Sequence, residues 1–261
     1  MLWVLVLLGL IQGLTEFLPV SSSGHLVLLY NIFGINGDNL LLSILLHVAT
    51  LLSVVITYRK DLCQLIKHPF CKTNINLIIA TIPTVLIVLF FKDIIDILFG
   101  GELLVFSFLL TALLLVISEF MSSKYNFVTN NTNVININIK WWQALLIGVS
   151  QGIAVIPGLS RSGTTISTAL ISGIDKENAT KFSFILSIPV IIGSLIFEIM
   201  QGGTLSIDES FWSVGLGFLV AFVIGMFAIK VMQKLVAKSK LYYFSYYLLV
   251  LSAVIVVFNL V

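Results

Sequence analysis

The amino-acid sequence predicts an all-α polytopic membrane protein, an inverted-topology repeat with six full spans and two re-entrant helical hairpins. The first observation is composition: 59% of the 261 residues are hydrophobic and only 10% are charged. We therefore expect no segment that would form a soluble domain. The second is a set of apolar runs about as long as the 17–25 residues that cross a bilayer. The third is a motif that occurs twice, at an offset of 139 residues.

Six apolar runs are long enough to be full spans. They lie near residues 39–58, 75–91, 103–121, 179–200, 211–232 and 241–260. Four other apolar pieces are too short to cross and form two pairs, each joined by a turn rich in Pro, Ser and Gly. These pieces are residues 1–17, 24–33, 141–156 and 162–173. A broken helix at membrane depth requires protein or a watery cavity to satisfy its backbone, so the breaks predict two re-entrant hairpins and a cavity.

The motif is QGLTEFLPVSSSG from Gln12 and QGIAVIPGLSRSG from Gln151. We interpret it as an internal repeat. Residues 1–121 form the first repeat, 122–140 a cytoplasmic linker and 141–261 the second repeat, each repeat being a hairpin followed by three spans. We also expect the first helix to remain in the mature protein, because no Lys or Arg precedes it and cleavage near the serines would remove Glu16.

Topology follows from the order of spans and from the charges. A hairpin returns to its starting side and three spans then cross, so the second hairpin enters from the opposite face and the repeats are inverted. One face receives twelve Lys and Arg residues and the other only Lys92. The positive-inside rule makes the first face cytoplasmic. We therefore expect a multi-pass protein of the cytoplasmic membrane, with both termini outside, an active site open to the outer face and the Asn-rich linker as a solvated loop inside.

Arg161 is the most informative residue, because an Arg near mid-membrane costs about 2.5–3.5 kcal/mol on insertion scales and is normally kept for a partner or a substrate. A structural ion pair is the plainer interpretation. However, SRSG opens the second helix of its hairpin and SSSG opens the equivalent helix of the first. Free N–H groups at helix N-termini favour anions, so we expect an oxyanion-rich ligand such as phosphate or diphosphate. The net charge of +2 gives no reason to expect nucleic acid.

Three polar residues of the first hairpin have open roles. Glu16 either neutralises Arg161 or holds a divalent cation beside phosphates. Gln12, four residues earlier on the same helical face, adds a carbonyl ligand or orients the carboxylate. His25 is a helix cap or a candidate base, acid or nucleophile. His47 is interpreted as a packing residue, although it is the first one to re-examine.

The motifs QxxxE (Gln12 to Glu16), PVSSSGH (Pro19 to His25) and PGLSRSGTT (Pro157 to Thr165) together resemble the undecaprenyl-diphosphatase family of bacitracin-resistance membrane phosphatases. The resemblance implies hydrolysis of a C55 polyprenyl diphosphate to the monophosphate and inorganic phosphate on the outer face of the membrane. It implies recycling of the lipid carrier for cell-wall synthesis, and a divalent cation, Mg²⁺ or Ca²⁺. The implied partners are the polyprenyl lipid and the surrounding membrane lipids.

The resemblance also implies roles for single residues. Glu16 becomes the acid tied to metal or proton transfer, with Gln12 a weaker metal ligand because many relatives have Glu there. Ser22 and His25 become the candidates for attack and proton handling, with an activated water as the third option. Arg161 becomes the phosphate clamp. The residues that would line the diphosphate pocket are Ser21, Ser23, Ser160, Arg161, Ser162 and Thr165.

Two other classes of function compete with this interpretation. A lipid-phosphate or anion transporter, including a flippase, uses the same kind of inverted repeat with broken helices. A purely structural scaffold is the third class, and Arg161 in mid-membrane argues against it. Glu16, Ser22 and His25 on one hairpin favour chemistry over transport. The oligomeric state is left open, with a homodimer as one option.

Overall fold

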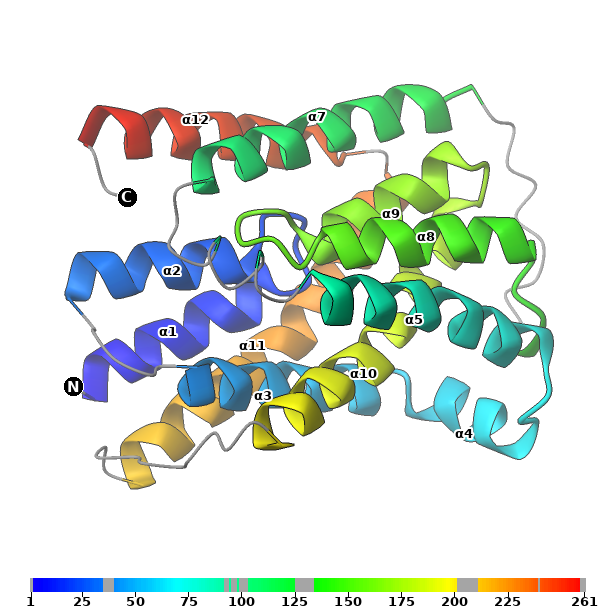
Figure 1. Ribbon diagram of the computed structural model, residues 1–261, viewed down its shortest axis with the longest axis horizontal. Coiled ribbons are helices and arrows are strands. Elements are labelled where there is room, and N and C mark those ends of the chain that lie inside the picture. Colours follow the sequence, from blue (N-terminus) through cyan, green and yellow to red (C-terminus); the bar gives the residue numbers. More distant parts are fainter. Residues whose placement is uncertain are drawn as a thin grey trace.

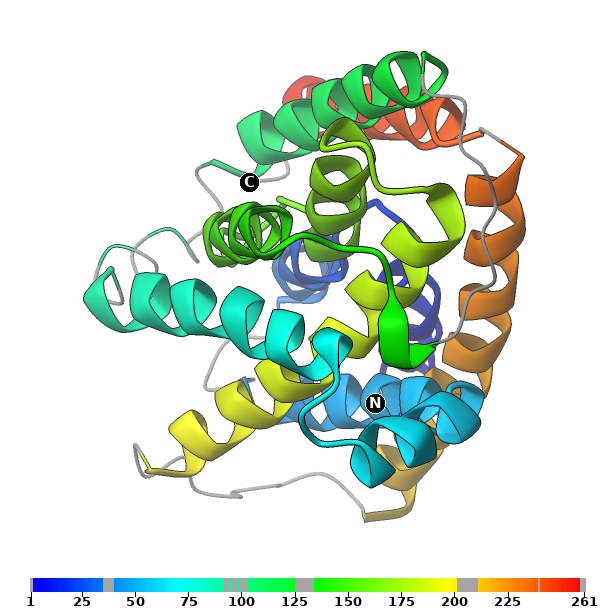
Figure 2. The same cartoon turned by 90° about the vertical axis from the view of Figure 1, so that its right-hand side faces the viewer.

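The computed structural model describes residues 2–34, 40–91, 94, 98, 103–124, 134–200, 211–238 and 240–258. Within these ranges every regular element is a helix, which confirms the predicted all-α class (Figures 1 and 2). The helices are α1 (Leu2–Thr15), α2 (Ser22–Phe33), α3 (Leu40–Thr57), α4 (Arg59–Lys67), α5 (Lys72–Phe90), α7 (Leu104–Ser122), the 3₁₀ turn η1 (Val134–Asn136), α8 (Trp141–Ile153), α9 (Arg161–Ile171), α10 (Lys176–Met200), α11 (Phe211–Ala237) and α12 (Tyr242–Phe258).

Four helices in the described part of the chain are long and apolar enough to cross a membrane, namely α5, α7, α10 and α11. The bent pair α3–α4 makes a fifth when it is taken as one span, whereas α12 is a shorter apolar helix of 17 residues. The prediction of a multi-span helical membrane protein is therefore confirmed. The predicted spans at 39–58 and 241–260 correspond to α3 and α12, and residues 39, 259 and 260 lie outside the described residues.

The bend between α3 and α4 has a direct chemical cause. The apolar helix α3 ends at Thr57, and Arg59, Lys60 and Asp61 open α4 at an angle of 77° to it. Charged side chains are unfavourable within the hydrocarbon core of a membrane and are more stable at its surface. The chain therefore turns here, and α4 continues as an amphipathic helix that buries Leu65.

Two helical hairpins face each other across the centre of the molecule. In Figure 1, α1 and α2 lie side by side at one end, α8 and α9 lie side by side at the other, and their turns meet in the middle. The first turn contains Ser21 with a positive φ of 68°, and the second contains Gly158 with a φ of 86°. The four short pieces predicted from sequence therefore fold as two pairs, each with its break near the predicted place.

Glycines allow each hairpin to approach a neighbouring helix closely. A Cβ atom on Gly9 of α1 would lie 2.2 Å from the Gly217 carbonyl oxygen of α11, and one on Gly148 of α8 would lie 2.1 Å from the Ala80 carbonyl oxygen of α5. Four residues further on, Gly13 and Gly152 make the next close approach to the same two helices. Small residues at this spacing let helix backbones touch in membrane proteins, so they fix the position of both hairpins.

The remaining helices enclose this centre. Helix α7 packs against α12, and α3 packs against α11. Helix α10 crosses the bundle diagonally in Figure 2 and contacts α3, α5, α9 and α11. The fully buried rings of Phe17, Phe182 and Phe184 fill the interior where α10 meets the first hairpin. Helix α10 is therefore the element that borders most of the cavities described below.

The C-terminal end of the Asn-rich linker differs from the solvated loop that we expected. Val134 and Ile139 are buried, and their carbonyl oxygens accept hydrogen bonds of 2.6 Å from the Thr73 hydroxyl and 2.9 Å from the Asn76 amide of α5. Apolar residues among the asparagines thus anchor this segment to α5. Residues 125–133 of the linker lie outside the described residues.

The close approach of α8 to α5 predicts a sharp cost for one added methyl group. Gly148→Ala should lower the melting temperature by about 3–10 °C, because overpacking of this kind costs roughly 1–3 kcal/mol. Alanine otherwise favours a helix over glycine, so only the clash can account for a loss. The measurement is thermal unfolding in detergent, with Gly193→Ala of α10 as control because its Cβ would meet nothing within 4 Å. Equal melting temperatures for the two variants would contradict this packing.

Candidate active site between the two hairpin turns

Glu16 follows directly after α1, and its carboxylate is the centre of a buried polar network. Its side chain is only 2% exposed. Oε2 accepts hydrogen bonds from the Gln12 amide at 3.0 Å and from the Ser22 hydroxyl at 2.6 Å. The Nε2 atom of His47, on α3, lies 3.5 Å from the same oxygen. The first hairpin therefore supplies an acid with two hydrogen-bond donors of its own.

Arg161 connects the second hairpin to this acid. It is the first residue of α9, and its Nη2 donates to Glu16 Oε1 in an ion pair between the two hairpins. The other terminal nitrogen, Nη1, is buried and has no hydrogen-bond partner among the described residues. A buried donor without a partner carries a desolvation cost, so this nitrogen is available to an incoming acceptor.

The two turns begin their second helices in the same way. The Ser21 hydroxyl accepts a hydrogen bond of 3.2 Å from the Gly24 amide, and the Ser160 hydroxyl accepts one of 3.0 Å from the Gly163 amide. Each serine also lies 3.3 Å from the hydroxyl two residues later, Ser23 or Ser162. Serine caps of this kind start helices. The result is two helix N-termini, with their positive ends, directed to one region.

A cavity of about 240 Å³ lies at this meeting point. Its polar lining comes from both hairpins, α3 and α10. The polar residues that line it are Thr15, Glu16, Ser21, Ser22, Ser23, Ser43, His47, Gln151, Ser160, Arg161 and Ser194. A second void of about 10 Å³ lies beside Glu16, Arg161 and Ser162. The cavity that the broken helices predict is therefore present, and its polar residues are mostly serines.

Six of the predicted site residues line this cavity, and four have other surroundings, namely Gln12, Ser162, Thr165 and His25. Gln12 is fully buried behind Glu16 and reaches the cavity only through that carboxylate. The Ser162 hydroxyl donates to the Leu18 carbonyl of the opposite hairpin at 3.3 Å. Thr165 Oγ1 lies 2.5 Å from Ser183 Oγ and 2.8 Å from the Arg161 carbonyl oxygen. Thr165 is therefore held between α9 and α10, behind the cavity.

His25 points toward α12. Its Nδ1 lies 2.7 Å from the Ser21 carbonyl oxygen, so Nδ1–H donates, and its Nε2 lies 2.7 Å from the Tyr247 hydroxyl. The two rings are nearly parallel, with 5.8 Å between centroids. His25 is not among the residues that line the cavity. Both ring nitrogens are engaged, and its role in proton handling stays a prediction.

His47, which the sequence predicts to be a packing residue, is the imidazole that lies beside the Glu16 carboxylate. Its Nδ1 donates to the Ser43 carbonyl at 2.7 Å, which directs Nε2 toward Glu16. Ser43 and His47 lie four residues apart on one helical face of a mostly apolar span, and this polar pair is the signal that could have identified them. Gln151, the counterpart of Gln12 in the repeat, also lines the cavity.

The cavity offers few protein ligands for a divalent cation. The described residues hold no group of three or more His, Cys, Asp and Glu side chains suited to a metal ion. The cavity has one carboxylate, Glu16, and behind it the Gln12 Oε1 atom, which is buried without a partner in this part of the chain. Mg²⁺ is commonly bound by one or two carboxylates together with phosphate oxygens of a substrate. These residues would hold a cation only together with a phosphate ligand, and the cation would compete with Gln12, Ser22 and Arg161 for the Glu16 oxygens.

Fold and site together define a multi-span helical membrane protein with a guanidinium, a carboxylate and serine hydroxyls gathered in one buried cavity. A family model described as "Bacitracin resistance protein BacA" matches residues 5–254. The chain belongs to this family.

Curated relatives match along nearly the whole chain. A protein of Carboxydothermus hydrogenoformans is 42% identical over 258 residues, which cover 97% of this chain and 95% of the relative. Proteins of Alkaliphilus metalliredigens and Bacteroides thetaiotaomicron are 39% and 37% identical, each covering 98% of both chains. All three are named undecaprenyl-diphosphatase. The resemblance stated from the motifs is thereby confirmed.

Proposed function

We propose that this chain hydrolyses undecaprenyl diphosphate, or another polyprenyl diphosphate, to the monophosphate and inorganic phosphate. Arg161 is the main support: one terminal nitrogen pairs with Glu16, and the other is buried without a partner beside a hydroxyl-lined cavity. A guanidinium can bind a phosphate oxygen through a free N–H while it remains paired to a carboxylate. The names of the relatives supply the substrate class.

Electrostatic stabilisation would provide most of the catalysis. The N-termini of α2 and α9 and the Nη1 atom of Arg161 surround the cavity with hydrogen-bond donors. Donors fixed before the reaction stabilise the charge that spreads over the phosphoryl oxygens as the anhydride bond breaks. A cation bound at Glu16 would neutralise part of the charge on the diphosphate.

Ser22 is the best-placed nucleophile of the three candidates, because its hydroxyl donates to the Glu16 carboxylate at 2.6 Å. In this scheme the Ser22 oxygen attacks the terminal phosphorus and its proton passes to Glu16. The bond from phosphorus to the bridging oxygen breaks, and the lipid monophosphate leaves. Water then hydrolyses the phosphoserine and releases inorganic phosphate. His25, held by Ser21 and Tyr247, would keep the first turn of α2 in place.

We infer inverted repeats with six spans from residues that have equal roles at the offset of 139. Gly9 and Gly13 on α1 correspond to Gly148 and Gly152 on α8, and each pair allows a close approach to another helix. Ser21 and Ser160 correspond as helix caps. At this offset α1 corresponds to α8, and α5 corresponds to α11. The hairpin helix of each repeat therefore packs against a span of the other repeat, α1 against α11 and α8 against α5, as a pseudo-two-fold axis requires. The short helix α12 and the bent pair α3–α4 then each count as one full span.

The orientation that we propose rests on charge. The twelve-positive face is placed in the cytoplasm, so both termini and the opening of the polar cavity lie on the outer side. Hydrolysis on that side would recycle the lipid carrier for cell-wall synthesis. The same reaction would lower the amount of lipid diphosphate in the membrane. We propose that this loss of lipid diphosphate underlies the bacitracin resistance in the family description.

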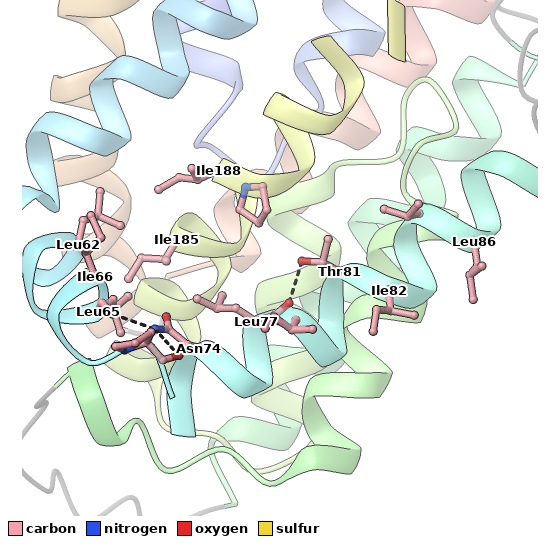
Figure 3. A pocket seen from close by; sticks show the side chains of 14 residues that line it. Leu62, Leu65, Ile66, Asn74, Leu77, Thr81, Ile82, Leu86, Ile185 and Ile188 are labelled. Atoms are coloured by element: carbon pink, nitrogen blue, oxygen red, sulfur yellow. Dashed lines mark hydrogen bonds between the residues drawn. The ribbon is translucent and has the colours of Figure 1, made fainter. Parts of the chain in front are cut away.

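The polyprenyl tail needs an apolar surface beside the polar cavity. A groove of about 800 Å³ between α4, α5 and α10 meets this need, and Figure 3 shows Leu77 and Ile82 of α5 and Ile185 and Ile188 of α10 around it. Ile188 and Pro189 line the groove, while the next residues, Val190 and Ile191, line the polar cavity. Because one turn of α10 borders both spaces, we propose that the tail occupies this groove.

A phosphate-release assay in detergent tests the activity, since no transport can occur there. The wild-type protein should release phosphate from C15 and C55 diphosphates. Arg161→Lys should reduce kcat/KM roughly 100-fold, because a point charge cannot bridge Glu16 and a phosphate as the planar fork does. Arg59→Lys, at an exposed position of α4, is the matched control and should retain full activity. Transport of labelled lipid in vesicles without phosphate release would favour a flippase instead.

The proposed cation predicts a specific effect of Glu16→Gln. The variant should lose stimulation by Mg²⁺ or Ca²⁺, since an amide oxygen is a much weaker ligand than a carboxylate. The measurement is the rate of phosphate release against cation concentration, starting from chelator-treated protein. Glu119→Gln is the control, because Glu119 accepts its hydrogen bond from the Leu241 amide, away from the cavity. A cation titration unchanged by Glu16→Gln would count against the metal role.

The proposed tail groove predicts an effect that depends on chain length. Ile78→Trp and Ile82→Trp place rings in the groove from positions that are 59% and 53% exposed. Each should raise KM for the C55 diphosphate several-fold and change KM for the C15 diphosphate little, because only the longer tail reaches along α5. Leu113→Trp, 55% exposed on α7 outside the groove, is the control. An equal change for both substrates would refute this tail position.

A further inference from the structure

Gln151 lines the polar cavity and leaves one atom of its amide without a partner. It lies near the end of α8, just before the break of the second hairpin, and the residue is only 1% exposed. Its Nε2 donates to Thr84 Oγ1 of α5 at 3.0 Å, whereas its Oε1 is buried and has no hydrogen-bond partner among the described residues. A buried carbonyl oxygen without a donor carries a desolvation cost. None of the steps proposed above uses this acceptor.

Hydrogen-bond chemistry fixes which end of the Gln151 amide faces Thr84. The Thr84 hydroxyl has a single proton, and its oxygen lies 2.9 Å from the Gly148 carbonyl oxygen and 3.1 Å from the Ala80 carbonyl oxygen. Because carbonyl oxygens only accept, the proton goes to one of these two and the hydroxyl oxygen accepts from Gln151. Nε2 therefore faces Thr84, and the atom left free is Oε1.

The equivalent glutamine of the first repeat, Gln12, has different surroundings. Its Nε2 donates to Glu16, and its Oε1 is also buried without a partner in the described part of the chain. Glu16 separates Gln12 from the cavity, but the equivalent of Glu16 in the second repeat is Val155, which has no polar side-chain group. Gln151 thus borders the cavity itself, and Gln12 does not.

The cavity around Gln151 is rich in hydrogen-bond donors. The Nη1 atom of Arg161 and the N-termini of α2 and α9 are suited to the oxygens of an anion. The Glu16 oxygens already accept from Gln12, Ser22 and Arg161. A ligand that satisfies this arrangement therefore offers several acceptor oxygens to the donors and one proton to Gln151 Oε1. A phosphoryl group that retains one P–OH has this combination.

A metal ion is the alternative partner of Oε1, because amide oxygens also bind cations. However, the second repeat supplies no carboxylate beside Gln151, since Val155 takes the place of the acid. The Arg161 guanidinium of the same hairpin adds a positive charge to the cavity. A hydrogen-bond donor therefore fits this position better than a cation does.

We propose that Gln151 Oε1 accepts a hydrogen bond from the P–OH group of a singly protonated phosphoryl ligand, and so selects phosphate over fully ionised tetrahedral anions. The inference rests on the phosphate site of the proposed function and adds a specificity-determining residue to it. Inorganic phosphate retains at least one P–OH group at neutral pH. Sulfate has the same shape but no proton, so it would place a negative oxygen against the Gln151 acceptor. Sites built to hydrogen-bond one group of a ligand discriminate against analogues that lack it.

The test measures binding of inorganic phosphate and of sulfate to purified, chelator-treated protein, from thermal unfolding in a neutral detergent at constant ionic strength. The wild-type protein should bind phosphate roughly tenfold more tightly than sulfate. Gln151→Met keeps the length of the side chain but removes the acceptor, so phosphate binding should weaken roughly tenfold and become similar to sulfate binding. Gln143→Met is the matched control. Gln143 is a buried glutamine of the same helix whose amide donates to the Ser172 carbonyl, outside the cavity, and its variant should keep the preference.

Gln151→Asn is a second variant, which withdraws the amide oxygen by one carbon and retains a polar group, and it should also lower the preference for phosphate. Equal binding of the two anions by the wild-type protein, or a preference unchanged in both Gln151 variants, would overturn the inference and leave the phosphate site of the proposed function in place. Equal weakening of both anions in Gln151→Met would show a structural role and would also overturn it. A shifted Mg²⁺ titration with an unchanged anion preference would assign Gln151 to a cation instead. Binding of neither anion by the wild-type protein would overturn the phosphate site itself.

Discussion

The ion pair between Glu16 and Arg161 is the interaction on which the centre of this protein depends. Each charge belongs to a different hairpin, and both lie where water is scarce. A buried charge without a partner is strongly unfavourable, and removing one member of a buried pair typically costs about 3–5 kcal/mol. The pair therefore fixes the depth at which the two turns meet. The positions of Gln12 and Ser22 around the carboxylate follow from it.

The two hairpins use one backbone design with different chemistry. Ser21 and Ser160 cap their helices in the same way, and the glycines of α1 and α8 bring each hairpin against a neighbouring helix. At other corresponding positions the side chains differ. Val155 is the equivalent of Glu16 in the repeat, and Arg161 is the equivalent of Ser22. The shared residues build the cavity, and the differing ones place acid, hydroxyl and guanidinium within it.

Helix α10 borders three different surfaces along its length. It first borders a cleft shared with α11, at Lys176 and Lys181. It then borders the apolar groove at Ile185 and Ile188, and finally the polar cavity from Val190 to Ser194. Charged and apolar surfaces are thus arranged in order along one rigid element. This arrangement suits a protein that handles a molecule with a phosphate head and a hydrocarbon tail.

Patterns in the sequence were enough to predict the helical class, the two broken helices, and a site that contains both Glu16 and Arg161. Apolar run length and helix-capping serines depend only on neighbours within a few residues, and the motif repeated at an offset of 139 residues relates the two turns to each other. Packing between distant helices decided the rest. Tyr247 engages His25 from 222 residues away, α3 brings His47 to the carboxylate, and Thr73 and Asn76 bind the end of the linker. Such partners depend on how whole helices lie against one another, and no local pattern contains that information.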